Sequence, residues 1–287
     1  MATSYWFASG TFVLDGGWGT QLQLRGLAIG EHPDLWNLSH PDKVRDVAAA
    51  YVQAGSDIIL TNTFGANRLL LAKHHAAEKV AELNRAGVRL SKEIAQKQNR
   101  RVFASIGPSG VMLMSGTVTS DELYGVFLEQ AEAMAAEQPD GIVVETMSDP
   151  AEAVLAVKAA KTTGLPVAAC MVFDTGKNKD RTMMGTTPEQ AVEQLTAAGA
   201  DIVGANCGQG IDGFIPICRR MRAVTTLPLW MKANAGLPEI VDEKTVYRQT
   251  PEKFAESAKE LLAAGANFLG GCCGTTPDFI RALREGL

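Results

Sequence analysis

Three of the five cysteines in this 287-residue chain occur in a setting suited to a metal ion. Cys272 and Cys273 are adjacent and lie between glycines, and Cys207 ends a short β-rich run. Taken alone, the adjacent pair could be a strained disulfide, two small buried residues or two metal ligands. The third thiol favours a metal, because zinc accepts tetrahedral sulfur ligands and catalytic sites keep a fourth position open.

The chemistry expected of such a site follows from its charge. A free thiol is mostly protonated at neutral pH, whereas a coordinating thiol is deprotonated outright. Three protein thiolates would outweigh the charge of Zn²⁺, and a substrate thiolate would add to the excess. Sulfur on such an electron-rich ion stays nucleophilic, which suits attack on a methyl carbon better than hydrolysis by zinc-bound water. We therefore predict a zinc site that activates a substrate thiol for methylation.

Two acidic residues could recognise an amino-acid substrate. The carboxylates of Asp15 and Glu145 would accept hydrogen bonds from its ammonium group, and the N–H groups of the Gly16-Gly17 turn would hold its carboxylate. Other interpretations remain open at this point. Asp15 could simply form a turn before glycine, and Glu145 could belong to an ion pair. Asn234 either turns toward the metal or is a turn residue.

Eight short β-rich runs could position these residues. They are Phe12–Asp15, Asp57–Asn62, Val102–Ile106, Gly141–Glu145, Val167–Val172, Ile202–Asn206, Leu229–Ala233 and Asn267–Gly271. Most of the candidate residues lie at or just after the ends of these runs. Parallel strands would bring those ends together, and Asn62 at the end of the second run is expected beside the substrate.

A helical pattern follows each run, near residues 42–54, 77–97, 121–137, 149–163, 188–198, 212–223, 252–264 and 277–286. Glycines at 55, 199 and 265 suit helix C-caps, and Thr187, Thr250 and Thr276 each precede proline as N-caps. Eight alternations predict a (β/α)8 TIM barrel. An open doubly wound sheet is the alternative, but no Gly-rich dinucleotide turn supports it. The longest irregular pieces are expected near 16–40, 107–120 and 234–250.

The bulk properties fit one globular domain spanning residues 1–287. Apolar residues make up 46% of the chain, and the formal net charge of -5 argues against nucleic acid as a partner. No signal peptide or membrane span is evident, so we expect a cytoplasmic protein with reduced cysteines. His32, His40, His74 and His75 are expected in loops or on the surface, and Cys170 and Cys218 in the core.

Four segments together resemble the homocysteine S-methyltransferase family, which includes the homocysteine-binding module of cobalamin-dependent methionine synthase and betaine–homocysteine methyltransferase. The segments are Asp15–Thr20, Leu60–Ala66, Gly204–Cys207 and Gly270–Pro277. The resemblance implies a zinc-bearing barrel that methylates L-homocysteine to methionine. It implies zinc on Cys207, Cys272 and Cys273, and it suggests Asn234 as a fourth ligand before the substrate arrives. It also implies that Asp15 and Glu145 engage the substrate amino group and that amides after Asp15 engage the carboxylate.

The methyl donor stays open, because the cobalamin-binding motif Asp-x-His-x-x-Gly is missing from this sequence. A methyl-corrinoid protein would need a broad docking surface, whereas a sulfonium such as S-methylmethionine would need only a pocket. Two further hypotheses keep the same barrel. It could methylate another thiol, acting alone or as the acceptor component of a corrinoid system, or it could be a non-enzymatic component that responds to zinc or thiols.

Overall fold

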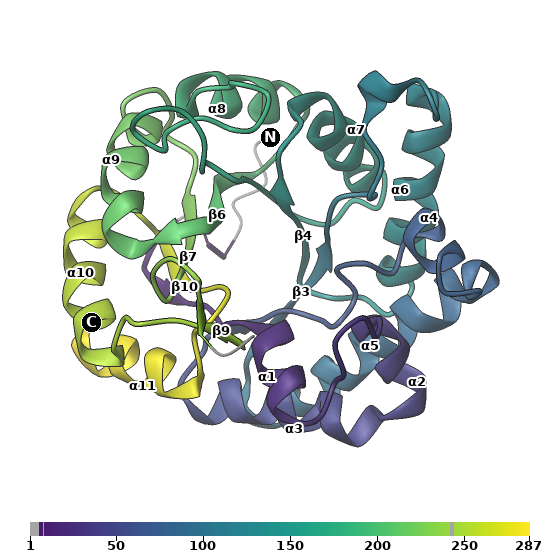
Figure 1. The fold of residues 1–287 in the computed structure, drawn as a ribbon, viewed down its shortest axis with the longest axis horizontal. Helices are drawn as coiled ribbons and strands as arrows, with labels where there is room; N and C mark the ends of the chain where they lie inside the picture. The colour runs from purple at the N-terminus through teal and green to yellow at the C-terminus, as the bar shows by residue number, and fades with distance from the viewer. Residues whose placement is uncertain (1–5, 8, 242–243) are drawn as a thin grey trace.

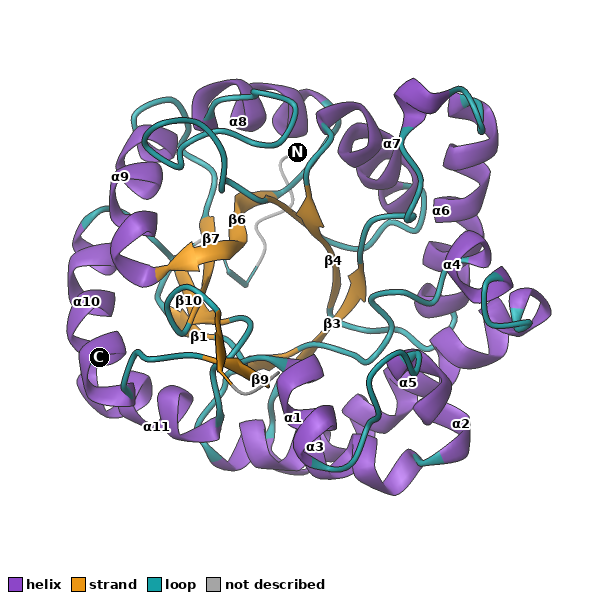
Figure 2. Cartoon of the chain, viewed as in Figure 1, coloured by secondary structure: helices purple, strands orange, loops and turns teal. Residues whose placement is uncertain are grey.

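The computed structural model describes residues 6–7, 9–241 and 244–287. Its main sheet contains eight parallel strands that follow one another in chain order, from β1 through β7 to β10. Figures 1 and 2 look into this ring of strands and show the helices arranged around its outside. The predicted (β/α)8 barrel is confirmed.

The strands of the barrel lie close to the predicted runs. Their bounds are β1 Phe12–Val13, β2 Ile58–Ile59, β3 Arg101–Ile106, β4 Gly141–Met147, β5 Val167–Met171, β6 Ile202–Gly210, β7 Leu229–Asn234 and β10 Phe268–Gly271. The strands β4 and β6 extend beyond the prediction, and each has a register shift near its end. These two irregular strand ends carry Glu145 and Cys207.

Eight long helices alternate with these strands. They are α3 Pro41–Gln53, α5 Val80–Ala95, α6 Ser120–Ala135, α7 Pro150–Lys161, α8 Pro188–Ala197, α9 Ile211–Arg222, α10 Pro251–Ala263 and α11 Pro277–Gly286. Thr187 caps its helix as predicted and forms a capping box with Gln190, and Thr250 also caps its helix. Thr276 occupies the N-cap position of α11, as predicted, although its side chain makes no capping hydrogen bond.

Additional short elements occur within the described residues, both in the segments expected to be irregular and elsewhere between the strands and long helices. Three short helices lie at the mouth of the barrel or beside it: α1 Trp18–Leu24, α2 Trp36–Ser39 and α4 Arg68–Ala72. Four 3-10 turns accompany the helices: η1 Pro33–Leu35, η2 Ala77–Lys79, η3 Gln96–Gln98 and η4 Leu113–Ser115. A hairpin of β8 Glu239–Val241 and β9 Lys244–Val246 follows β7. All residues of β8 are exposed. A strand that buries neither face has no need for alternating apolar and polar residues, which is why the sequence pattern did not predict it.

An acidic or amide residue before every second strand links neighbouring strands. The side chains of Asp57, Asp140, Asp201 and Asn267 accept hydrogen bonds from the first N–H groups of the strand preceding theirs, at 2.8–3.0 Å. The backbone N–H of each of these four residues also donates to the same neighbouring strand. Asp57, Asp201 and Asn267 each follow a helix-ending glycine by two residues, so these short segments end a helix and also align a pair of strands.

Apolar side chains fill the lower part of the barrel interior, and polar side chains follow them toward the mouth. Phe103, Val143 and Trp230 belong to the interior cluster. Because alternate residues of a strand share a face, the residues two positions further on also point inward: Ser105, Glu145 and Lys232. A second and larger apolar cluster packs the strands against the surrounding helices. No helix within the described residues is long and apolar enough to cross a membrane.

Candidate active site

The three predicted metal-binding thiols meet at the mouth of the barrel. The Sγ atoms of Cys207, Cys272 and Cys273 all lie within 4.8 Å of one another, and those of Cys207 and Cys273 are 3.8 Å apart. For zinc–sulfur bonds of about 2.3 Å, a tetrahedral arrangement separates two sulfur atoms by about 3.8 Å. All five cysteines are free thiols. The spacing of this cluster therefore fits a tetrahedral metal ion, with one coordination position left for another ligand.

The end of β6 adopts an unusual backbone to present Cys207. Its φ angle is 62°, in the left-handed region that non-glycine residues rarely adopt, and Thr146 at the end of β4 has a φ of 63°. The Asn206 side chain joins the two strand ends, accepting from the Thr146 N–H and donating to its hydroxyl, each at 2.7 Å. Such strained positions persist only where surrounding contacts enforce them.

The side chain of Asn234, at the end of β7, and the backbone of Ala235 support the backbone of the cysteine loop. The Asn234 Oδ1 atom accepts a hydrogen bond from the Cys273 N–H at 3.1 Å, and the Ala235 N–H donates to the Cys273 carbonyl at 3.0 Å. Asn234 thus lies next to the thiol cluster, as predicted from the sequence. A role for Asn234 as a metal ligand stays a prediction.

The surroundings of the cluster disfavour a thiolate that has no counter-ion. A hydrogen bond to Cys207, together with burial and nearby negative charge, raises the pKa of the Cys272 thiol well above its usual value. A hydrogen bond with Cys207 lowers the pKa of the Cys273 thiol, but the neighbouring Cys272 thiol and burial outweigh this effect and raise the pKa to about 12. The cluster therefore needs a cation to hold its sulfur atoms as thiolates near neutral pH.

The thiols open onto a cavity of about 470 Å³. Glu145 lies in the wall of this cavity and is 7% exposed. Its Oε1 atom accepts a hydrogen bond from the Ser105 hydroxyl at 2.5 Å, and Asn206 Nδ2 lies 3.4 Å from Oε2. Burial raises the pKa of the Glu145 carboxyl, and the Lys232 ammonium opposes that rise. Glu145 thus places a carboxyl group in the wall of the cavity onto which the three thiols open.

Asp15 is fully buried and is not among the residues that line the cavity. Its Oδ2 atom accepts hydrogen bonds from Trp18 Nε1 and from the Leu60 N–H, both at 2.6 Å, and its Oδ1 atom pairs with the Lys232 ammonium. Both carboxylate oxygens therefore already have protein partners. In this geometry Asp15 holds the neighbouring cation in place.

The Gly16-Gly17 turn packs closely against the cysteine loop. A Cβ atom on Gly17 would lie 2.6 Å from the Cys272 carbonyl oxygen, so only glycine permits this approach. The Gly17 N–H donates to Thr275, at 3.2 Å to its carbonyl and 3.1 Å to its hydroxyl. The turn lines the cavity, although one of its two N–H groups is already used within the protein.

Lys232 is a charged residue of the cavity wall that the sequence reasoning missed. It lies in β7, is 2% exposed and lines the same cavity as Glu145. Burial lowers the pKa of the Lys232 ammonium, but the charges of Asp15 and Glu145 outweigh this effect and raise the pKa. A charged residue within the otherwise apolar run Leu229–Ala233 was the signal, because lysine is rarely buried without a partner.

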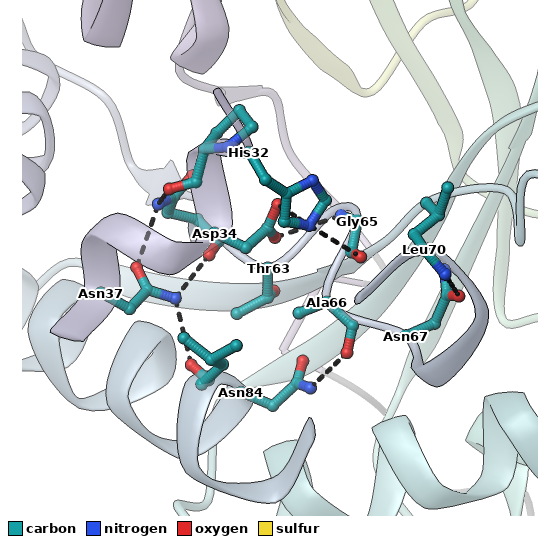
Figure 3. A network of polar contacts seen from close by, with 12 residues as sticks. His32, Asp34, Asn37, Thr63, Gly65, Ala66, Asn67, Leu70 and Asn84 are labelled. Carbon is teal, nitrogen blue, oxygen red and sulfur yellow. Dashed lines mark hydrogen bonds and ion pairs between the residues drawn. The ribbon is translucent and has the colours of Figure 1, made fainter. Parts of the chain in front are cut away.

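A second part of the cavity wall is a buried polar network (Figure 3). Asp34 accepts from the Gly65 N–H at 3.1 Å, and His32 Nε2 lies 3.3 Å from the Asp34 carboxylate. Asn62 donates to the Pro33 carbonyl and to Asn37. Asn62 reaches the cavity as predicted. His32 lies in a loop, as expected, but its side chain is only 10% exposed. Cys170 and Cys218 are buried in the core, as predicted.

Fold and site together define a (β/α)8 barrel with a three-thiol candidate metal centre at its mouth. The profile of the family described as homocysteine S-methyltransferase matches residues 12–287. The chain therefore belongs to the homocysteine S-methyltransferase family, as its motifs indicated.

Individual relatives agree with this family. Methionine synthase of Mycobacterium leprae (strain TN) is 28% identical over 96% of this chain, and that of Mycobacterium tuberculosis (strain ATCC 25618 / H37Rv) is 28% identical over 93%. The match spans only 24% of each of those proteins. The metallated form of the homocysteine methyltransferase MmuM from Escherichia coli superposes with a TM-score of 0.79 over 96% of both chains, at 21% identity. At 21% identity, the similarity to the MmuM structure concerns the fold alone.

Proposed function

We propose that this protein is a zinc-dependent methyltransferase that converts the thiol of L-homocysteine to the thioether of methionine. One observation carries the proposal: three thiols with tetrahedral spacing open onto the same cavity as a buried carboxylate. The thiols suit zinc, and the carboxylate suits the ammonium group of an amino acid. Membership of the homocysteine S-methyltransferase family supports this substrate.

Cys207, Cys272 and Cys273 would hold the zinc ion, and Asn234 is the candidate for a fourth ligand before substrate binds. Zinc at this position would supply the positive charge that keeps the substrate sulfur deprotonated. The protein itself binds and orients the amino acid. Glu145 accepts the substrate ammonium, while Asp15 acts indirectly by positioning Lys232.

The remaining predicted residues shape the substrate cavity. Gly16 and Gly17 bring the end of β1 against the cysteine loop, and amides of this turn remain candidates for the substrate carboxylate. Asn62 holds the loop that contains Pro33 in the cavity wall. We propose a cytoplasmic location, because a reducing compartment would keep the cluster as thiols that a metal ion can bind.

Two kinds of methyl donor remain to be separated. A methyl-corrinoid protein would have to cover the mouth, where Met114, Met183 and Ile240 are exposed on loops that follow β3, β5 and β7. A sulfonium such as S-methylmethionine would have to enter the cavity beside the thiols. Both donors release a leaving group that needs no protonation, so neither requires a general acid.

The test supplies purified protein and L-homocysteine with methylcobalamin, S-methylmethionine or betaine, and quantifies methionine and bound zinc. We expect about one zinc per chain in a catalytic site of this type. Cys273→Ala should lose the zinc and lower methionine formation more than about 100-fold, because changing residues that only hydrogen-bond to the ligands of a metal typically costs about 10- to 100-fold.

Cys218→Ala is the matched control. Cys218 is a buried thiol in α9 whose contact is the Leu261 carbonyl, outside the cluster. This variant should retain zinc and activity. Full methionine formation by metal-free protein, or by Cys273→Ala, would contradict the proposal.

A further inference from the structure

We propose that Lys232 binds the carboxylate of the amino-acid substrate, so that Lys232 and Glu145 together recognise its zwitterionic end. This inference rests on the proposed function and extends it by naming the group that selects an α-amino acid among thiols. Lys232 and Glu145 line one cavity with Cys207 and Cys272. A substrate whose sulfur reaches the thiol cluster can therefore reach both charged side chains.

Strand register explains why the Lys232 side chain points into the barrel. Trp230 belongs to the interior cluster, and Lys232 lies two residues further along the same face of β7. Lys232 is paired in register with Asn206 on one side and with Gly270 on the other. A Cβ atom on Gly270 would lie 2.5 Å from Leu14 Cβ, so no side chain at this position shields Lys232 from that direction.

The Lys232 ammonium has N–H donors without an acceptor among the described residues. A lysine ammonium has three N–H donors, and the one protein acceptor found for it among the described residues is Asp15 Oδ1. Buried donors without partners are costly, and Lys232 is 98% buried, given its exposed fraction of 2%. Two donors facing the cavity therefore form a site for an anion, and a carboxylate provides two acceptor oxygens.

The neighbouring groups assign complementary tasks to the two charged residues. Asp15 pairs with the Lys232 ammonium and holds it in place. Both oxygens of the Asp15 carboxylate are engaged within the protein, by Lys232, by Trp18 and by the Leu60 N–H. Glu145 has an Oε2 atom whose one contact among the described side chains is Asn206 at 3.4 Å, which is long for a hydrogen bond. The free acceptor of Glu145 then suits the substrate ammonium, and the free donors of Lys232 suit the substrate carboxylate.

Three small-molecule ligands that each carry a thiol distinguish the contact with Lys232 from the contact with Glu145. L-Homocysteine carries both charged groups, 3-aminopropane-1-thiol lacks the carboxylate, and 4-mercaptobutanoate lacks the ammonium. Binding to zinc-loaded protein is measured by isothermal titration calorimetry, and kcat and KM are measured where methylation is detected. In Lys232→Met we expect affinity for L-homocysteine and 4-mercaptobutanoate to fall roughly 10- to 100-fold, as loss of a charged hydrogen bond predicts. Affinity for 3-aminopropane-1-thiol should stay the same.

Glu145→Gln is the matched comparison and should show the reverse pattern. Its affinity for L-homocysteine and 3-aminopropane-1-thiol should fall, with that for 4-mercaptobutanoate retained. Lys232→Arg keeps the charge and should restore part of the discrimination between L-homocysteine and 3-aminopropane-1-thiol.

Lys232→Met leaves Asp15 buried without its cation, which can impair folding. The double variant Asp15→Asn/Lys232→Met removes both charges and should fold while still failing to discriminate on the carboxylate. Equal weakening for all three thiols in a folded variant, or unchanged affinity for L-homocysteine, would overturn the role of Lys232. Failure of the wild-type protein to bind any of these thiols would instead overturn the proposed function.

Discussion

Asp34 is a carboxyl group buried in the cavity wall, and its environment disfavours the charged form. It is 2% exposed, and burial raises its pKa from the ordinary value of 3.8 to about 7, although a hydrogen bond from the Gly65 N–H works against this rise. His32 is the titratable group that faces it, and burial lowers the pKa of that imidazole. The charge of the Asp34 carboxyl therefore changes near neutral pH.

This predicts a pH-dependent loss of stability. The folded state binds the Asp34 proton more tightly than the unfolded chain, so its stabilising effect is present below pH 4 and is lost as pH rises toward 7. Replacing Asp34 with Asn removes this titration. Relative to wild type, the variant should gain up to roughly 4 kcal/mol of unfolding free energy between pH 4 and pH 8.

Denaturant unfolding at several pH values measures this difference. Asp42→Asn is the control for the substitution itself, because the Asp42 side chain is 95% exposed. A difference between Asp34→Asn and wild type that is the same at pH 4 and pH 8 would show that Asp34 does not titrate as expected.

At the scale of elements, the loop after β10 determines whether the thiols converge. Gly274 in this loop has a φ of 79°, and a Cβ atom there would lie 2.2 Å from the Tyr247 ring. Tyr247 follows the β8–β9 hairpin, so this contact ties that segment to the cysteine loop. The close packing of two loops therefore supports the geometry of Cys272 and Cys273.

Gly274→Ala should disturb this loop more than backbone strain alone explains. A left-handed non-glycine residue costs about 1–2 kcal/mol, and the clash with Tyr247 adds to that cost. We expect loss of at least roughly 2 kcal/mol of unfolding free energy and reduced zinc content. Gly164→Ala is matched in backbone, with a φ of 75°, but its Cβ would meet nothing within 4 Å. That control should retain zinc, and equal effects of the two changes would exclude the steric explanation.

At the scale of the molecule, closure of the barrel at one seam relies on side-chain contacts in addition to a backbone hydrogen bond from the Asp57 N–H to the Val13 carbonyl. The order of the sheet places β1 and β2 at its two ends, without ladder pairs between them among the described residues. Asp57 bridges this seam, accepting from the Val13 N–H at 2.9 Å while pairing with Arg100 and Arg284. Asp15 bridges it nearer the mouth through the Leu60 N–H. Closure and site assembly thus share the residues of one seam.

Asp57→Ala should therefore destabilise the barrel more than the equivalent change elsewhere. Asp140 makes the same kind of bond to the Val102 N–H, but β3 and β4 are also joined by four register pairs. We expect losses of about 2–4 kcal/mol for Asp57→Ala and about 1–2 kcal/mol for Asp140→Ala, from the number of charged hydrogen bonds removed. Chemical denaturation compares the two, and equal losses would mean that the seam has no special weakness.

Features set by local physics could be predicted from the sequence. Apolar runs followed by helical patterns indicated the eight barrel strands and their helices, because burial imposes those periods on nearby residues. Glycines at helix ends adopt the left-handed conformation at Gly55, Gly199 and Gly265, as predicted. The flanking glycines of the adjacent cysteines, and Cys207 at the end of a strand run, were enough to predict the thiol cluster.

Features set by pairing across the barrel emerged only in the tertiary structure. Asp15 and Lys232 are 217 residues apart, and nothing near Asp15 in the chain indicates that its carboxylate pairs with a buried lysine. The same holds for the approach of His32 to Asp34 and for the packing of Tyr247 on Gly274. The chain by itself determined which residues lie at the strand ends. Register and closure decided which of them face each other, because these depend on contacts between segments far apart in sequence.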